Sequence, residues 1–114
     1  MAPTQHEIDS YSLFHMVDTF PLSAIIQCSG GGSSKGSLYF YKEGTTIPVS
    51  YRSGSGTLIL NFRENQLTDV LATLRQEKPL YIWFDDSGST LAGGLIASHE
   101  PIGEAEPLRW NILG

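Results

Sequence analysis

Hydrophobic and β-branched residues predict strands along most of the first 62 residues. Residues 11–20 (YSLFHMVDTF) and 22–28 (LSAIIQC) are rich in aromatic and β-branched side chains, which is typical of strands. A short helix also fits residues 11–20. Further strands are expected at 47–52 (IPVSYR), where Pro48 favours an edge or a strand start, and at 57–62 (TLILNF).

The aromatic segment SLYFYKEG (37–44) predicts a strand with two different faces. Leu38 and Phe40 alternate with Tyr39 and Tyr41, so the two pairs are expected on opposite sides. One pair therefore belongs to the core, and the other pair is only partly exposed to water.

A different period predicts one amphipathic helix at about residues 64–76. Apolar residues recur three or four positions apart and form one stripe: Leu67, Val70, Leu71 and Leu74. Pro79 ends the pattern, because proline cannot continue a helix. Two strands follow, LYIWFDD (80–86) and LAGGLIAS (91–98), joined by a hairpin turn at 86–90.

This order of elements predicts an α+β fold. Short connections favour antiparallel pairing, so we expect a strongly curved antiparallel β-sheet or a small barrel of about seven strands, covered by the one helix. Residues 1–10 are polar with no apolar period, which predicts a flexible N-terminus. Residues 11–114 then form a single β-rich domain, since 114 residues suit one core.

Composition and charge narrow the class of protein. Residues 1–10 lack the pattern of a signal peptide, no segment approaches ~18 apolar residues, and Cys28 has no partner for a disulfide, so we expect a cytoplasmic protein without membrane contact. The net charge of −5 makes duplex DNA an improbable ligand. Residues 35–78 are mildly basic, with six Lys or Arg against four Asp or Glu.

The glycine-rich segment CSGGGSSKGS (28–37) raises the question of phosphate binding. A nucleotide-binding loop places lysine after the last glycine and opens a helix. Here Lys35 precedes Gly36 and an aromatic strand follows, so both conditions fail and the pattern argues against a nucleotide-binding loop. We expect a hairpin loop of about seven residues. The pattern leaves open a lid at Gly30–Gly36, whose glycine amides and Lys35 would bind an anion.

Tyr39 and Tyr41 are the main candidates for recognition. Exposed aromatic side chains on a strand are typical of proteins that stack single-stranded bases. The alternative is that both tyrosines pack beneath the helix or in a subunit interface. Arg52 and Arg63 lie near strand ends in the basic middle of the chain and would contact phosphate in the first case.

The sequence contains no arrangement typical of a catalytic or metal site. His6, His15 and His99 lack metal-ligand spacing. No local signature joins Cys28 to His15 as a nucleophile pair. Carboxylates gather toward the C-terminal end, where acid–base chemistry is a third, weaker reading: Asp85, Asp86, Glu100, Glu104 and Glu106.

We therefore expect a non-enzymatic binding module without a cofactor. It would self-associate as a homo-oligomer and bind a partner protein or a small anionic ligand, in regulation or in phage–host conflict. The expected ligand-binding residues are Lys35, Tyr39, Tyr41, Arg52 and Arg63. The alternative is a single-stranded nucleic-acid-binding domain that uses the same aromatic residues.

Overall fold

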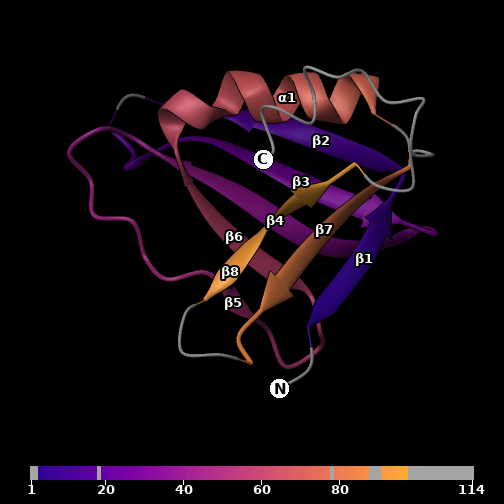
Figure 1. The fold of residues 1–114 in the computed structure, drawn as a ribbon. Coiled ribbons are helices and arrows are strands. Elements are labelled where there is room, and N and C mark those ends of the chain that lie inside the picture. The colour runs from indigo at the N-terminus through magenta and orange to yellow at the C-terminus, as the bar shows by residue number, and fades with distance from the viewer. Residues whose placement is uncertain (1–2, 18, 78, 88–90, 98–114) are drawn as a thin grey trace, which may run out of the picture.

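The computed structural model describes residues 3–17, 19–77, 79–87 and 91–97 (Figure 1). These residues form strands and one short α-helix, which confirms the α+β class. The strands are β1 (Thr4–Ile8), β2 (Ser10–His15), β3 (Leu22–Gly30), β4 (Ser33–Tyr41), β5 (Tyr51–Arg52), β6 (Leu58–Arg63), β7 (Leu80–Asp85) and β8 (Ala92–Ile96). A 3-10 turn, η1 (Glu64–Gln66), leads directly into the helix α1 (Leu67–Gln76).

The strands form two separate sheets, which corrects the expectation of one curved sheet or barrel of about seven strands. Among the described residues, eight strands divide into a five-stranded sheet of order β2-β3-β4-β6-β5 and a three-stranded sheet of order β1-β7-β8. Neither sheet closes into a barrel. Figure 1 shows β1, β7 and β8 crossing in front of the five-stranded sheet, with α1 along its upper side.

Pairing is antiparallel except between β4 and β6, which run parallel. The reason lies in the connection after β4. Residues 42–50 carry the chain to the sheet edge, where β5 forms and turns back, so that β6 enters between β4 and β5. A parallel neighbour needs such a long connection, whereas a tight hairpin gives only antiparallel pairs.

Thr4–Ile8 belong to the segment expected to be a flexible N-terminus, yet they form β1 and pair with β7 from Thr4↔Phe84 to Ile8↔Leu80. Only Ile8 is buried in this strand. Strand pairing is carried by backbone hydrogen bonds, so a polar segment can join a sheet without an apolar period. Asp9 then separates β1 from β2, and the chain passes there from one sheet to the other.

The core lies between the inner face of the five-stranded sheet and a second layer made of the three-stranded sheet and α1. It includes Ile26, Leu38, Phe40, Leu58 and Ile82, all fully buried. The predicted stripe of α1 is confirmed: Val70 is buried, and Leu67, Leu71 and Leu74 pack against the core. Among the described residues, no helix has the length and apolarity that crossing a bilayer requires.

Candidate binding face

The glycine-rich segment is a tight turn, which corrects the expectation of a seven-residue loop. Gly31 and Gly32 have φ angles of 59° and 85°, and they connect the paired residues Gly30 and Ser33. Two central residues with positive φ match the twist of the flanking strands. Ser33 to Gly36 belong to β4 and pair with β3, so this segment is not a lid.

A carboxylate of the chain itself occupies the turn for which the sequence leaves open an anion-binding lid. The backbone N–H of Gly31 donates a hydrogen bond to Oδ2 of Asp9 at 3.1 Å. Asp9 thus ties the link between the two sheets to the tip of the β3–β4 hairpin. Lys35 is half-exposed on β4, on the side opposite to the buried Gly36.

Gly30 and Gly36 serve packing and not flexibility. A Cβ atom on Gly30 would lie 2.2 Å from the carbonyl oxygen of Glu7, where β1 crosses β3. A Cβ on Gly36 would lie 2.6 Å from the carbonyl oxygen of Leu58 and 2.8 Å from Cδ1 of Ile82. These two glycines therefore allow the backbones and the second layer to approach closely.

The side of the five-stranded sheet turned away from the core is the candidate binding face. We call it the outer face. Two rows of register partners cross it: Phe14–Ile25–Tyr39–Asn61 and Ser12–Gln27–Ser37–Ile59–Tyr51. Both α1 and the three-stranded sheet pack on the opposite, inner side, so no described element covers the outer face.

Tyrosines dominate the outer face. Tyr39 and Tyr41 lie on the same side of β4, and Tyr51 pairs with Ile59 in the neighbouring row. Burial raises the pKa of Tyr41, and the phenols of Tyr39 and Tyr51 raise it further. Tyr51 retains 54% of its surface exposed and Phe14 retains 47%. The reading in which Tyr39 and Tyr41 pack beneath the helix is wrong, because Leu38 and Phe40 occupy that side of β4.

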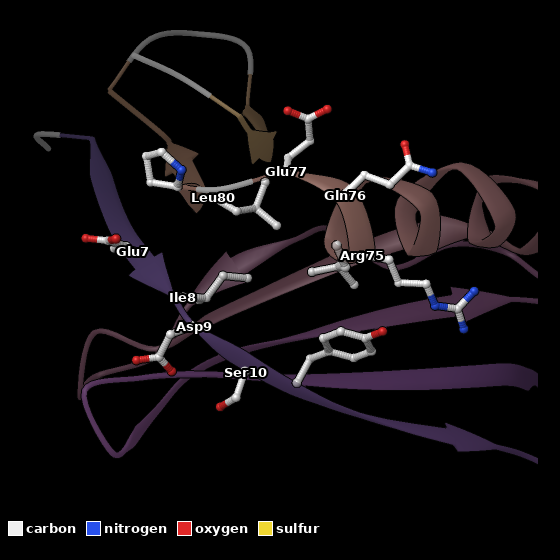
Figure 2. A pocket seen from close by; sticks show the side chains of 11 residues that line it. Glu7, Ile8, Asp9, Ser10, Arg75, Gln76, Glu77 and Leu80 are labelled. Atoms are coloured by element: carbon white, nitrogen blue, oxygen red, sulfur yellow. The ribbon is translucent and has the colours of Figure 1, made fainter. Parts of the chain in front are cut away.

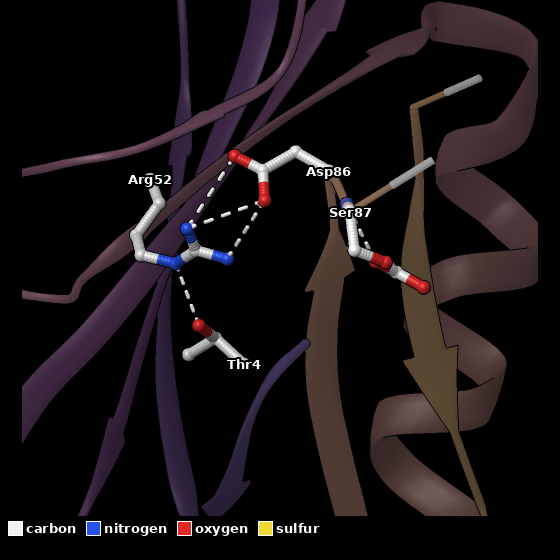
Figure 3. A network of polar contacts seen from close by, with 5 residues as sticks. Thr4, Arg52, Asp86 and Ser87 are labelled. Carbon is white, nitrogen blue, oxygen red and sulfur yellow. Dashed lines mark hydrogen bonds and ion pairs between the residues drawn. The ribbon is translucent and has the colours of Figure 1, made fainter. Parts of the chain in front are cut away.

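The structure does not bring Arg52 together with these tyrosines. Its Nε donates to Oγ1 of Thr4 at 2.6 Å, and Nη2 lies 3.3 Å from Oδ1 of Asp86 (Figure 3). Its guanidinium also lies over the buried ring of Phe84, 5.6 Å from the centroid. Arg52 therefore clamps β5 to β1 and to the end of β7, between the two sheets.

Arg63 is the register partner of Tyr41, yet its guanidinium is engaged by the connection that follows β4. Its Nη1 donates to the carbonyl oxygens of Lys42 and Thr45 at 3.1 and 2.7 Å. Lys42 in turn donates from Nζ to the carbonyl oxygen of Val17 at 3.1 Å. Of the expected ligand-binding residues, Tyr39 and Tyr41 lie together, whereas both arginines hold loops or layers in place.

Cys28 and His15 are not arranged as a nucleophile and base. Cys28 is fully buried, and burial raises the pKa of its thiol to about 12. It pairs with Tyr11, whereas His15 pairs with Ala24, four residues or roughly 13 Å further along β3. A protonated, inaccessible thiol is a poor nucleophile at neutral pH.

The described carboxylates after β7 have structural partners. Hydrogen bonds from the side chain and backbone of Ser87 lower the pKa of Asp85, and Asp86 pairs with Arg52. Glu100, Glu104, Glu106 and His99 lie outside the described residues. Within the described part of the chain, no group of three or more His, Cys, Asp or Glu residues is arranged to hold a metal ion.

A pocket of about 490 Å³ lies between the β1–β2 junction and the end of α1 (Figure 2). Ile8, Leu74 and Leu80 form part of its apolar lining. Its acidic residues do not converge: Glu7 and Asp9 point away from α1, and Glu77 points away from β1 and β2. Ligand pockets usually combine an apolar lining with polar groups aimed at one place, so this pocket is a weaker candidate than the outer face.

A second crevice, of about 270 Å³, lies between β6 and β8, with Phe62 and Phe84 among its lining residues. Asn61 also lines it. Its Nδ2 donates to the carbonyl oxygens of Pro48 and Val49, so it connects β6 to the segment that precedes β5. This crevice is small, and its lining mixes polar and apolar groups. No protein-family model, curated protein or solved structure matches the chain.

Sequence reasoning found Tyr39 and Tyr41 and missed four of their neighbours: Phe14, Ile25, Tyr51 and Ile59. Alternation within β3 and β4 assigns each residue to one of two faces. It does not tell which residues of other strands stand beside them, because that depends on register.

Proposed function

We propose that this chain is a non-enzymatic binding module that recognises another polypeptide through the outer face of its five-stranded sheet. One observation carries the proposal: Tyr39, Tyr41 and Tyr51 lie with Ile25 and Ile59 on a sheet face that no described element covers. Protein interfaces are enriched in tyrosine and depleted of charge at their centres. Both properties hold for the two rows of this face.

A protein partner is better supported than a small anionic ligand. Arg52, Arg63 and Lys42 already hold a carboxylate or backbone carbonyls. Recruiting them to an external anion would break contacts that join loops and layers. Lys35 alone would be a weak anion site, since one half-exposed ammonium in water gains little from a single ion pair.

Site-specific photo-crosslinking tests the proposal. A photoreactive residue in place of Tyr39 is expected to form covalent adducts with protein when the full chain is expressed in its source cells. The matched control carries the same residue in place of Thr68, which is exposed on α1. A further Ser37→Glu substitution on the outer face is expected to remove the Tyr39 adducts. Equal adduct yields from both positions, or adducts that persist with Ser37→Glu, would contradict the proposal.

Single-stranded nucleic acid is the second candidate, because solvent-facing tyrosines on adjacent strands resemble the stacking platforms of such proteins. Its weakness is that the two central rows carry no cation. Fluorescence anisotropy with a labelled pyrimidine oligonucleotide separates the candidates. Affinity that falls steeply with added salt supports nucleic acid, and no binding at low salt excludes it.

A further inference from the structure

We infer that the partner of the outer face is a second copy of this chain, with two outer faces packed against each other around a two-fold axis. The inference rests on the proposed function and specifies its partner. Three properties of the face carry it: its charge, its hydrogen-bonding groups and its area.

The two central rows of the outer face contain no Asp, Glu, Lys or Arg. In a face-to-face pair with two-fold symmetry, each side chain near the axis meets its own copy. A charged residue there would meet a like charge, which costs several kcal/mol across an interface. Since each chain carries a net charge of −5, two copies approach most favourably through a face that lacks acidic residues.

The polar groups of the same rows complement themselves. Tyr39, Tyr51, Ser37 and Gln27 all carry side chains that both donate and accept hydrogen bonds. A copy of this surface therefore offers a matching group for every donor and every acceptor. The rings also pair favourably with other rings in offset or edge-to-face geometry. A surface whose side chains only donate hydrogen bonds, such as lysines, could not pair with its own copy in this way.

The area suits a reversible dimer. Four strands of six to nine residues and the two-residue β5, spaced about 4.8 Å apart, present roughly 500 Å² per copy. Two such faces together remove about 1,000 Å² from water, which is near the minimum for a biological interface and is typical of weak, reversible association. Phe14, 47% exposed at the β2 side, and Tyr51, 54% exposed at the β5 side, would then lose most of their contact with water.

Sedimentation equilibrium of the full chain tests this inference. The weight-average mass is expected to rise from the monomer value of 12.5 kDa toward twice that value as the concentration increases from about 1 to about 500 µM. Ser37→Glu and Tyr39→Glu each place two like charges across the proposed axis. Each is expected to raise the dimer dissociation constant about 100-fold or more.

Ser37→Glu replaces a small, half-exposed side chain, so it retains the fold even if Tyr39→Glu does not. Thr68→Glu adds the same charge on the exposed side of α1 and is expected to leave dimerisation unchanged. A wild-type chain that stays monomeric, or a dimer that survives Ser37→Glu, would overturn the inference. A monomer whose Tyr39 position still crosslinks to other proteins overturns only the second-copy partner and leaves the proposed function standing.

Discussion

Oδ2 of Asp9 accepts a hydrogen bond from the backbone N–H of Gly31 at 3.1 Å, which joins the crossing point between the two sheets to the tip of the β3–β4 hairpin. A carboxylate from 22 residues earlier in the chain therefore occupies the turn amide that an external anion would have used. The glycines of this segment have two roles: Gly31 and Gly32 adopt positive φ angles, and Gly30 and Gly36 allow close packing. Each role leads to a separate prediction.

Gly31 and Gly32 are needed for backbone conformation. Gly32 has a φ of 85°, and a side chain in this region costs about 1 kcal/mol. We expect Gly32→Ala to lower the free energy of unfolding by about that amount in urea titrations. Gly54→Ala is the matched control: Gly54 is exposed in a turn, with open space around it and no positive φ. A change within about 0.5 kcal/mol is expected there, and equal losses in both variants would contradict the assignment.

Gly36 is needed for packing. Because its Cβ would lie 2.6 Å from a backbone oxygen, we expect Gly36→Ala to cost about 3 kcal/mol or more, as overpacked cores do. Urea unfolding followed by circular dichroism measures this loss. Ser37→Ala, one residue later on the opposite side of β4, is expected to be nearly neutral. A well-folded Gly36→Ala variant of wild-type stability would show that the second layer is not held this closely.

The Arg52–Asp86 pair is expected to stabilise the contact between the two sheets. Their side chains are 14% and 30% exposed, so solvent screens the pair less than a surface ion pair. Arg52→Ala also removes the Thr4 hydrogen bond and the contact with Phe84, and we expect it to cost about 2 kcal/mol. Arg75→Ala, on the exposed side of α1, is the control with little expected effect. Similar losses in both variants would argue against the clamp.

Burial of Cys28 predicts a loss of stability in alkali. The pKa of its thiol is raised from 9.0 to about 12 in the folded chain, so only the unfolded chain releases this proton between these values. The free energy of unfolding should therefore be unaffected by this group below pH 9. It should fall by about 1.4 kcal/mol per pH unit as the pH rises toward 12.

Cys28→Ala isolates this effect from the tyrosines and lysines that titrate in the same range. The variant is expected to be less stable at pH 8 because it leaves a small cavity, but to show a shallower decline between pH 9 and 11. Parallel declines for the two proteins would mean that the thiol is accessible in the folded state. In that case a thiol reagent would modify Cys28 without denaturant.

Local sequence patterns predicted several elements of the fold because their cause is local. The 3.6-residue period of Leu67, Val70, Leu71 and Leu74 specifies a helix with one buried side wherever it packs. The alternation of Leu38 and Phe40 with Tyr39 and Tyr41 separates core from outer face within one strand. The α+β class follows from these two periods together.

The predictions that failed concern relationships between distant segments. The polar β1 strand has no period to announce it, because it is held by backbone pairing with β7, more than 70 residues later. The parallel pairing of β4 with β6 depends on how residues 42–50 cross the sheet edge. Pairing by backbone hydrogen bonds is almost independent of side-chain identity, so hydrophobic patterns report it poorly.

By itself, the sequence determined which residues share a face on β4 and which side of the helix is apolar, because side-chain direction follows the local backbone period. Only the tertiary structure decided that the strands divide between two sheets and that Arg52 and Arg63 hold the layers and loops. It also decided that Phe14, Ile25 and Tyr51 join Tyr39 on one open face. Register and layer contacts join residues far apart in the chain, and their free energies arise only when the whole core assembles.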